Sequence, residues 1–337
     1  MQNLRIILLP FSWIYGFIVF LRNRFYDWGI YSSSESNVFT VVVGNLNTGG
    51  TGKTPHTLLL SGWFSEPVAI LSRGYGRSTK GFLNVLPSSN AKEVGDEPLL
   101  YAKNGQYKVA VCENRLKGIH TLFNQGHRGV VLLDDAFQHR RLKADFNVLL
   151  IAKAKPIFND FYLPAGDLRD SKLEIRRAQS VIITGCDGTE DAMEWRQKLR
   201  LKKEQTLFFS GTIQKELKLF SGDAGEPKQR IALVTAIAKE NRLKTHLEKK
   251  FEIVKHWNYR DHHSFSEQEV QNWKTFADKE NLDIVTTEKD AMRMHQLLPH
   301  LEGMNLWMAP IEVQIKDGEM LKKQIIQCYD LAKKSKS

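Results

Sequence analysis

The chain has 337 residues, a length that favours two domains over one, and its 42% hydrophobic and 26% charged residues are typical of a globular protein. Its formal net charge of +10 predicts an anionic partner, and leaves open a nucleic acid, an anionic bilayer surface and a phosphorylated substrate. The sequence has no run of five Lys or Arg residues and no RNA-binding or zinc-finger signature, so we expect no nucleic-acid partner. Three widely spaced cysteines suggest neither a disulfide framework nor a zinc site, and they fit a reducing compartment: Cys112, Cys186 and Cys328.

The N-terminus carries an apolar stretch, IILLPFSWIYGFIVFL, at residues 6–21. It is shorter than the roughly 20 apolar residues that span a bilayer, and no small-residue cleavage site follows it. Its aromatic residues, with Arg22 and Arg24 directly after them, are typical of a helix that lies in the membrane interface against anionic headgroups. We therefore predict a membrane-associated helix within residues 1–35. The alternative is a helix that packs on the core of the protein.

Apolar runs with helical stretches between them follow this segment. Continuous runs of Val, Ile and Leu, without alternation, indicate strands buried on both faces, and hence a parallel sheet with helices on each side. The sequence therefore predicts an α/β fold, with a P-loop domain at residues 36–205 built on a doubly wound, mainly parallel sheet. Its expected strands are at residues 38–43, 67–71, 108–111, 129–133, 147–151 and 180–184.

A second, smaller α/β domain is predicted at residues 223–337. Residues 206–219 read TLFFSGTIQKELKL, which suggests two strands about a Ser-Gly turn, and the linker-like SGDAGEP follows. We interpret residues 206–222 as a two-stranded linker and hypothesise that the strands of residues 206–219 form the hinge for closure of the two domains. The strands of the second domain are expected at residues 231–235, 251–254, 283–286 and 305–308.

The stretch GNLNTGGTGKTP at residues 44–55 leaves a predicted strand and enters a predicted helix, as a phosphate-binding loop does. The match to G-x-x-x-x-G-K-[ST] is imperfect, because Asn47 stands where the first glycine is usual. Lys53 would reach the β and γ phosphates of ATP, and the hydroxyl of Thr54 would hold Mg²⁺. The alternative is a glycine-rich turn that only connects strand to helix. The predicted nucleotide-binding residues here are Asn47, Thr48, Gly49, Gly50, Thr51, Gly52, Lys53 and Thr54.

The run GVVLLDD at residues 129–135 is a hydrophobic strand that ends in two carboxylates, Asp134 and Asp135. A Walker B strand has this form, and it would bring one aspartate near the metal held by the P-loop. Such pairs also serve as helix caps. An amide, an imidazole and guanidinium groups follow this strand or two others and could neutralise charge during phosphoryl transfer: Gln138, His139, Arg73, Arg77 and Arg115.

Eight motifs in this order resemble those of the tetraacyldisaccharide 4′-kinase family, the lipid A 4′-kinases. The resemblance covers nearly the whole chain and lies in GNLNTGGTGKTP, LSRGYGR, VGDEP, CENR, LLDDAFQHR, LPAGDLRD, DHHSF and TTEKD. It implies an ATP- and Mg²⁺-dependent lipid kinase that phosphorylates the 4′-hydroxyl of a tetraacylated disaccharide 1-phosphate at the cytoplasmic face of the inner membrane of a Gram-negative bacterium. An acylated, phosphorylated acceptor would account for both the interfacial helix and the basic charge. We expect a monomer.

The resemblance also implies roles for particular residues. Asp96 matches the proposed catalytic aspartate, which would take the proton of the acceptor hydroxyl, and His262 matches its histidine partner from the other domain. On chemical grounds alone, His262 and the adjacent His263 are equal candidates, and only the position in the motif favours His262. Lys53 and Arg115 complete the predicted catalytic set. Other family positions linked to activity are matched by Gln138, His139 and Arg169.

Two segments depart from the family pattern. Residues 233–240 read LVTAIAKE, where the family often has a glycine-rich turn that ends in Asn-Pro, and Asp170 stands where a glutamate is common after Arg169. The main alternative function is a regulatory or metal-delivery P-loop NTPase, in which water replaces the sugar hydroxyl. A noncatalytic P-loop scaffold is a further alternative, and the intact Lys53, Thr54 and Asp134 argue against it.

Overall fold

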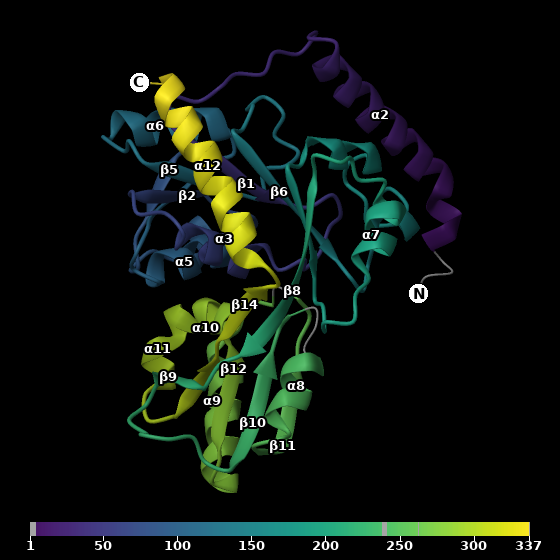
Figure 1. Ribbon diagram of the computed structural model, residues 1–337. Coiled ribbons are helices and arrows are strands. Elements are labelled where there is room, and N and C mark those ends of the chain that lie inside the picture. The colour runs from purple at the N-terminus through teal and green to yellow at the C-terminus, as the bar shows by residue number, and fades with distance from the viewer. Residues whose placement is uncertain (1–4, 238–240, 262, 337) are drawn as a thin grey trace.

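The computed structural model describes residues 5–237, 241–261 and 263–336, in which the strands form a larger and a smaller sheet (Figure 1). The larger sheet is parallel apart from its two edge strands, β14 and β3. It therefore confirms the predicted doubly wound α/β class. Its strands, in spatial order, are β14 (Ile311–Ile315), β8 (Thr206–Gln214), β7 (Ser180–Thr184), β6 (Phe146–Ala152), β1 (Thr40–Gly44), β5 (Val130–Asp134), β2 (Val68–Ser72), β4 (Lys108–Val111) and β3 (Leu83–Val85).

Helices cover both faces of the larger sheet because its central strands are apolar on both sides. Leu60 of α3, Leu321 of α12 and Leu99 of α5 are buried on one face, and Leu122 of α6 and Leu199 of α7 are buried on the other. The helices of this part are α3 (Lys53–Ser61), α4 (Ala91–Val94), α5 (Asp96–Lys103), α6 (Arg115–Asn124), α7 (Ala192–Leu199) and α12 (Gly318–Lys336), with the 3₁₀ turns η2 (Ile157–Asn159) and η3 (Lys172–Arg177).

The smaller sheet is parallel except for its edge strand β9, and α8 and α9 cover opposite faces of it. Its strands, in spatial order, are β11 (Glu252–Asn258), β10 (Arg230–Thr235), β12 (Asp283–Thr287), β13 (Leu306–Ala309) and β9 (Lys218–Ser221). The helices of this part are α8 (Asn241–Leu247), α9 (Glu267–Glu280), α10 (Glu288–Met294) and α11 (Leu298–Leu301), with η4 (His295–Leu297).

The expected turn at the Ser-Gly pair of residues 210–211 is wrong. β8 runs through both residues without a break, and its antiparallel partner is β14, with Gly211 opposite Gln314. β9, which follows β8 in the chain, belongs to the smaller sheet. The chain therefore passes between the two sheets once after β8 and again before β14. The local pattern could not indicate this pairing, because the partner strand lies far away in sequence.

The sequence pattern predicted that residues 223–337 all belong to the second domain. This is wrong for the C-terminal segment. After β13 the chain returns to the larger sheet as β14, and α12 lies along one face of that sheet (Figure 1). Leu321, Ile325 and Tyr329 of α12 pack there against the apolar side chains of β1, β5 and β6. An amphipathic helix at the C-terminus carries no local signal for which sheet it covers.

The N-terminal apolar stretch is helical, as η1 (Ile6–Leu8) and α2 (Leu9–Asp27). The larger sheet with its helices is called here the larger-sheet half, and the smaller sheet with its helices the smaller-sheet half. Helix α2 lies on the outside of the larger-sheet half, away from the smaller sheet (Figure 1). Ile6–Asp27 is the candidate membrane span among the described residues, with 22 residues and a mean hydropathy of 1.6 in its most apolar window. By length and composition alone this helix could cross a bilayer. Only 22% of that window is buried against the protein.

Candidate active site

The glycine-rich loop connects β1 to α3, as the sequence predicts. Gly49 and Gly52 have φ values of +106° and +81°, a region that residues with a side chain rarely adopt. Gly52 is the N-cap of α3, so the backbone N–H groups of the first helical turn face the loop. Lys53 and Thr54 begin this helix. The loop therefore has the backbone form that receives a phosphate group at a helix N-terminus.

Several polar groups of the loop are used to hold its shape. The buried amide of Asn47 donates from Nδ2 to the carbonyl of Lys155 over 3.2 Å. The backbone N–H of Thr48 donates to the carbonyl of Asp167 over 2.8 Å, and the hydroxyl of Thr51 accepts from Nδ2 of Asn45 over 3.0 Å. These contacts explain why a residue with a hydrogen-bonding side chain is tolerated at position 47, where a glycine is usual.

Asp134 is the last residue of β5, and its carboxylate is fully buried. Its Oδ2 accepts a hydrogen bond from the hydroxyl of Ser72 over 3.1 Å, whereas its Oδ1 has no hydrogen-bond partner among the described residues. Burial, followed by the charges of Glu97 and Asp135, raises the pKa of Asp134 to about 7. A buried carboxylate oxygen without a donor is a position where a cation would be stabilising.

Asp135 adopts a left-handed backbone conformation, with φ of +51°. Nη1 of Arg169 donates to its Oδ2 over 2.9 Å, the second terminal nitrogen of Arg169 contacts Oδ1, and Nζ of Lys53 lies 3.7 Å from Oδ1. Burial acts to raise the pKa of Asp135, but the hydrogen bond from Arg169 and the charge of Lys53 lower it to about 2. The structure thus brings the predicted lysine of the P-loop to the predicted acidic pair.

These residues fit Mg²⁺ by the chemistry of their donor atoms. The carboxylates of Asp134 and Asp135, with the hydroxyl of Thr54 next to Lys53, offer oxygen ligands, which Mg²⁺ prefers. Within the described residues, no group of three or more His, Cys, Asp or Glu side chains is arranged to hold a metal. An ion here would keep several water or phosphate ligands, as Mg²⁺ does in phosphoryl-transfer sites.

Arg115 contacts the backbone of the acidic pair, Asp134 and Asp135, and is 2% exposed. Nη2 donates to the backbone carbonyls of Asp134 and Asp135, each over 3.2 Å, and Nη1 donates to those of Cys112 and Glu113 over 3.0 and 3.2 Å. Burial lowers the pKa of Arg115 to about 10, which leaves the guanidinium charged at neutral pH. These contacts connect the end of β4 to the end of β5 and so fix the direction of both aspartates.

Gln138 and His139 follow the acidic pair. Nε2 of Gln138 donates to the carbonyl of Asn45 over 2.8 Å, which connects this turn to the start of the P-loop. Burial and the charges of Arg115 and Arg141 lower the pKa of His139 to about 4, so its ring is neutral at pH 7. Both residues therefore lie at the edge predicted for them.

The other two arginines expected at this edge differ in their contacts. Arg77 donates to the carbonyl of Gly81 over 2.6 Å and to Glu113 over 2.5 Å, and its side chain is 2% exposed. Arg73 is close enough to Arg115 for its charge to lower the pKa of that residue. Arg77 thus supports its own loop, and Arg73 stays a candidate for contact with a phosphate group.

Asp96 begins α5, directly after Gly95, which has a φ of +96°. Its Oδ2 accepts a hydrogen bond from Nε of Arg293 in α10 over 2.7 Å. Asp96 therefore lies where the two halves of the molecule meet. Burial and then the charge of Glu97, the residue after Asp96, raise the pKa of Asp134, which indicates that Glu97 lies near the acidic pair.

His262, the predicted partner of Asp96, lies outside the described residues. Its neighbour His263 stacks on Tyr259 with ring centroids 4.5 Å apart, and its Nε2 is 2.9 Å from Oε1 of Glu269. Its ring also contacts Phe265 edge-on. His263 is therefore engaged with side chains of its own half of the molecule.

Helix α2 contacts the same loops that carry the site, a relationship that the sequence analysis missed. The hydroxyl of Tyr15 donates to the carbonyl of Arg169 over 3.1 Å, and Arg22 donates to the carbonyl of Gln138 over 2.9 Å. The buried Asn23 donates to Asp170 over 2.7 Å. Helix α2 is thus connected to Gln138 and Arg169, two residues that themselves contact the start of the P-loop.

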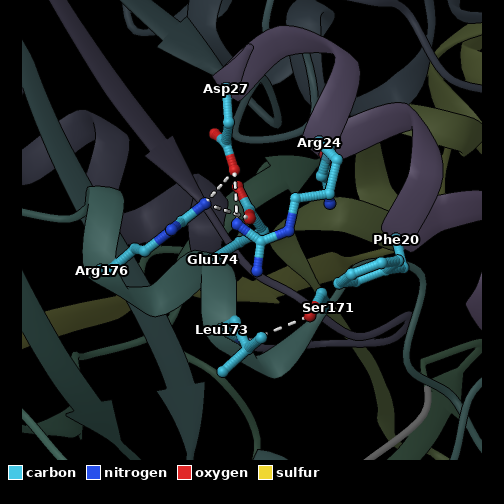
Figure 2. Close-up of a pocket in the computed structure, with 8 residues that line it drawn as sticks. Phe20, Arg24, Asp27, Ser171, Leu173, Glu174 and Arg176 are labelled. Carbon is cyan, nitrogen blue, oxygen red and sulfur yellow. Dashed lines mark hydrogen bonds and ion pairs between the residues drawn. The ribbon is translucent and has the colours of Figure 1, made fainter.

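A network of charged side chains fixes the C-terminal end of α2. Figure 2 shows Asp27 pointing from α2 towards Arg176, with Arg24 and Glu174 beside them in a small pocket. Asp27 also accepts from Arg140 over 2.8 Å. Burial acts to raise the pKa of Asp27, but hydrogen bonds from Arg140 and Arg176 outweigh it and lower the pKa. The paired charges hold this end of the helix against the protein.

A sequence model of the tetraacyldisaccharide-1-P 4′-kinase family matches residues 4–329. The chain belongs to this family. It is 37% identical to the tetraacyldisaccharide 4′-kinase of Cytophaga hutchinsonii, over 93% of this chain and 92% of that protein. It is 38% identical to the enzyme of the same name from Flavobacterium psychrophilum, over 95% of each chain. The crystal structure of LpxK from Aquifex aeolicus in complex with ATP superposes with a TM-score of 0.78 at 29% identity, over 97% of this chain and 99% of that one.

Family membership makes the chain a phosphotransferase and confirms the resemblance noted from its motifs. The alternative of a regulatory or metal-delivery NTPase is not favoured, since the match covers nearly the whole chain and not the P-loop alone. Two site features were visible only in three dimensions, namely the pairing of Arg169 with Asp135 and that of Arg293 with Asp96. The sequence points to Arg169 only through the family resemblance, and no motif in the sequence predicts a role for Arg293.

Proposed function

We propose that this chain is an ATP-dependent kinase that phosphorylates the 4′-hydroxyl of tetraacyldisaccharide 1-phosphate in lipid A biosynthesis. Family membership supports the activity and the acceptor, and ATP in the related Aquifex aeolicus structure supports the donor. The observation that carries the proposal in this chain is the approach of Lys53 to within 3.7 Å of Asp135. Glu97, the residue after Asp96, lies near enough to the same acidic pair for its charge to act on Asp134. In this proposal Lys53 is the phosphate-binding cation, Asp135 is a metal-binding carboxylate and Asp96 is the base.

In this reaction, the P-loop N–H groups and Lys53 would bind the β and γ phosphates of ATP. Bound Mg²⁺, held by Thr54, Asp134 and Asp135, would neutralise negative charge on these phosphates. Asp96 would take the proton of the 4′-hydroxyl as its oxygen forms a bond to the γ-phosphorus, while the bond to the oxygen of ADP breaks. The proton ends on Asp96 and the leaving group is ADP.

The remaining residues support these groups. His262 would orient Asp96, as the family motif implies. Arg115, through its contacts with the two backbone carbonyls, would keep Asp134 and Asp135 directed at the metal. Arg169 and Gln138 contact Asn45 at the start of the phosphate-binding loop and, with His139, would complete the nucleotide site.

We further propose that α2 lies in the interface of the cytoplasmic face of the inner membrane. One side of α2 is bound to the rest of the protein through hydrogen bonds that its own Tyr15, Arg22 and Asn23 donate. These bonds would have to break if the helix crossed the bilayer. Its other side is apolar and exposed, and would enter the acyl region beside the lipid acceptor. The exposed apolar side chains of η1 and α2 are Ile6, Ile7, Phe11, Trp13, Ile14, Phe17, Ile18 and Phe20.

The test of the proposed function is whether ADP release depends on the acceptor hydroxyl. The purified chain would be incubated with ATP and Mg²⁺ in detergent, with tetraacyldisaccharide 1-phosphate or with the same lipid methylated at the 4′-oxygen. A kinase releases ADP rapidly only with the free hydroxyl. Equal ADP release with both lipids, or with none, would indicate hydrolysis and contradict the proposal.

A further inference from the structure

The TTEKD motif at residues 286–290 has no part in the reaction described above, although it lies at the boundary between the two halves. It covers the end of β12 and the start of α10, and Thr287 is the N-cap of that helix. Asp290 is fully buried. Its Oδ2 accepts hydrogen bonds from the hydroxyl of Thr287 over 2.8 Å and from the backbone N–H of Ala236 over 3.0 Å. The motif thus fixes a carboxylate inside the molecule.

Arg293, three residues later, connects this carboxylate to Asp96. Its Nη1 donates to Oδ1 of Asp290 over 2.7 Å and to the carbonyl of Ala236 over 2.9 Å, while its Nε donates to Oδ2 of Asp96 over 2.7 Å. The side chain of Arg293 is 7% exposed. One buried guanidinium therefore bridges two carboxylates that come from different halves of the chain.

Apolar packing holds the helix that carries this guanidinium. Ala291 and Met292 of α10 are buried in the same cluster as Leu99 and Ala102 of α5, the helix that Asp96 begins. Because both helices are fixed against each other, the ion pair does not have to order two flexible surface side chains when it forms. The contact between the two halves is therefore held by apolar packing as well as by the ion pair.

We propose that Arg293 is a positioning residue for the base of the reaction, holding the carboxylate of Asp96 in the orientation that accepts the proton of the acceptor hydroxyl. This inference rests on the proposed function. A charge-assisted hydrogen bond at Oδ2 fixes the rotation of the carboxylate, and so the direction in which its other oxygen points. The TTEKD motif then has a role, because Asp290 orients the guanidinium that orients the base.

The competing interpretation is that the pair of Arg293 and Asp96 only holds the two halves together. Loss of a purely structural contact would lower stability and would disturb ATP binding and turnover alike. Loss of a positioning contact would lower kcat and leave the KM for ATP nearly unchanged, since Asp96 acts on the acceptor. The two interpretations also differ in what happens when Asp96 is already inactive.

The experiment measures acceptor-dependent phosphate transfer by the full chain, with the melting temperature of each variant recorded by circular dichroism. Arg293→Gln is expected to lower kcat by about 10- to 100-fold, as is typical for partners that orient an active-site group, and to change the KM for ATP by less than about 3-fold. Arg293→Lys, which keeps the charge, is expected to recover a large part of the loss. The matched control Arg230→Gln removes a guanidinium that pairs with Glu280 within the smaller-sheet half, and it is expected to keep wild-type turnover.

The decisive comparison is Arg293→Gln in an Asp96→Asn background. If Arg293 acts through Asp96, the second substitution adds no further loss to the residual transfer. Losses that multiply in the double variant, or wild-type kcat in a folded Arg293→Gln variant, would overturn the inference. If Arg293→Gln does not fold, Asp290→Asn takes its place, because it weakens the contact that orients the guanidinium. A folded Asp290→Asn variant with wild-type kcat would also overturn the inference. Failure of the wild type to phosphorylate the lipid would instead contradict the proposed function.

Discussion

Arg169 holds the carboxylate of Asp135 with two nitrogens of its guanidinium, and its own backbone carbonyl accepts a hydrogen bond from Tyr15 of α2. One residue thus contacts both the acidic pair of the proposed nucleotide site and the helix with the exposed apolar face. The backbone N–H of Arg169 also donates to the carbonyl of Leu46 in the P-loop over 2.9 Å. The segment around Arg169 therefore connects α2 to the phosphate-binding loop.

Substituting Arg169 tests this connection. Arg169→Gln removes the charge that lowers the pKa of Asp135 and the hydrogen bonds that orient its carboxylate. We expect kcat/KM for ATP to fall by about 10- to 100-fold, measured in the acceptor-dependent transfer assay. Arg128→Gln, at an exposed position after α6, is the matched control. Wild-type kcat/KM in the Arg169 variant would show that the pair has no role in the nucleotide site.

Arg115 is predicted to be a determinant of stability as well as of activity. Arg115→Gln would leave four backbone carbonyls without their charged donor in a buried position. We expect the free energy of unfolding to fall by about 3 kcal/mol, as is found when one partner of a buried charged contact is removed. Urea denaturation measures this change. Lys117→Gln, on an exposed position of the same helix, should change stability by less than about 0.5 kcal/mol. A loss below about 1 kcal/mol in the Arg115 variant would contradict the prediction.

His56 predicts a dependence of stability on pH. Its buried ring lies 2.7 Å from the carbonyl of Gly52 through Nδ1 and 2.9 Å from the hydroxyl of Ser210 through Nε2, contacts that suit a neutral ring with the proton on Nδ1. Burial lowers its pKa from 6.5 to about 4. Because the folded pKa is the lower one, the stabilisation is fully present above pH 6.5 and is lost as the pH falls to 4, by about 3 kcal/mol at most.

The check is the free energy of unfolding of the wild type and of His56→Gln between pH 4 and 8. The difference between the two proteins should be constant above pH 7 and should shrink, or reverse sign, towards pH 4, because only the wild type must charge this ring on acidification. Parallel pH profiles for the two proteins would contradict the assignment of a buried neutral imidazole.

The exposed face of α2 is predicted to bind bilayers. Trp13 and Phe17 are 69% and 61% exposed and lie one helical turn apart. Burial of such a side chain in the acyl region contributes about 1.5–3 kcal/mol, so Trp13→Ser and Phe17→Ser should each lower the partition onto anionic vesicles by roughly 10-fold or more. Flotation of the protein with vesicles measures this partition. Met193→Ser, which changes an 81% exposed apolar residue on α7, should have no effect. Unchanged flotation of the Trp13 and Phe17 variants would argue against this face as the membrane contact.

The parts of the fold that the sequence predicted are those with a local signal. The parallel strands were visible because continuous apolar runs report burial on both faces, and the predicted strand 180–184 coincides with β7. The pairing of β8 with β14 was not predictable in this way, since Gly211 and Gln314 are neighbours only after the second half of the chain has folded. For the same reason, no local pattern predicted that the C-terminal helix α12 packs on the larger sheet.

The candidate site likewise contains residues that short motifs predicted and contacts that no local pattern indicated. Lys53, Asp134 and Asp135 were predicted because glycine-rich loops and strand-ending carboxylates are short motifs with a known geometry. The contact between Arg293 and Asp96 joins residues 197 positions apart, and nothing in the neighbourhood of either residue indicates the other. The pairing of His262 with Asp96 and the hinge role of residues 206–219 stay predictions.

The most direct test of the central claim is transfer of labelled γ-phosphate from ATP to detergent-dispersed tetraacyldisaccharide 1-phosphate, comparing the wild type with Lys53→Ala and Asp96→Asn. A lipid kinase with this site should label the lipid at the 4′ position, and both variants should lose transfer by at least about 100-fold while Asp96→Asn still binds ATP. Labelled inorganic phosphate in place of labelled lipid, or full transfer by the Asp96→Asn variant, would contradict it.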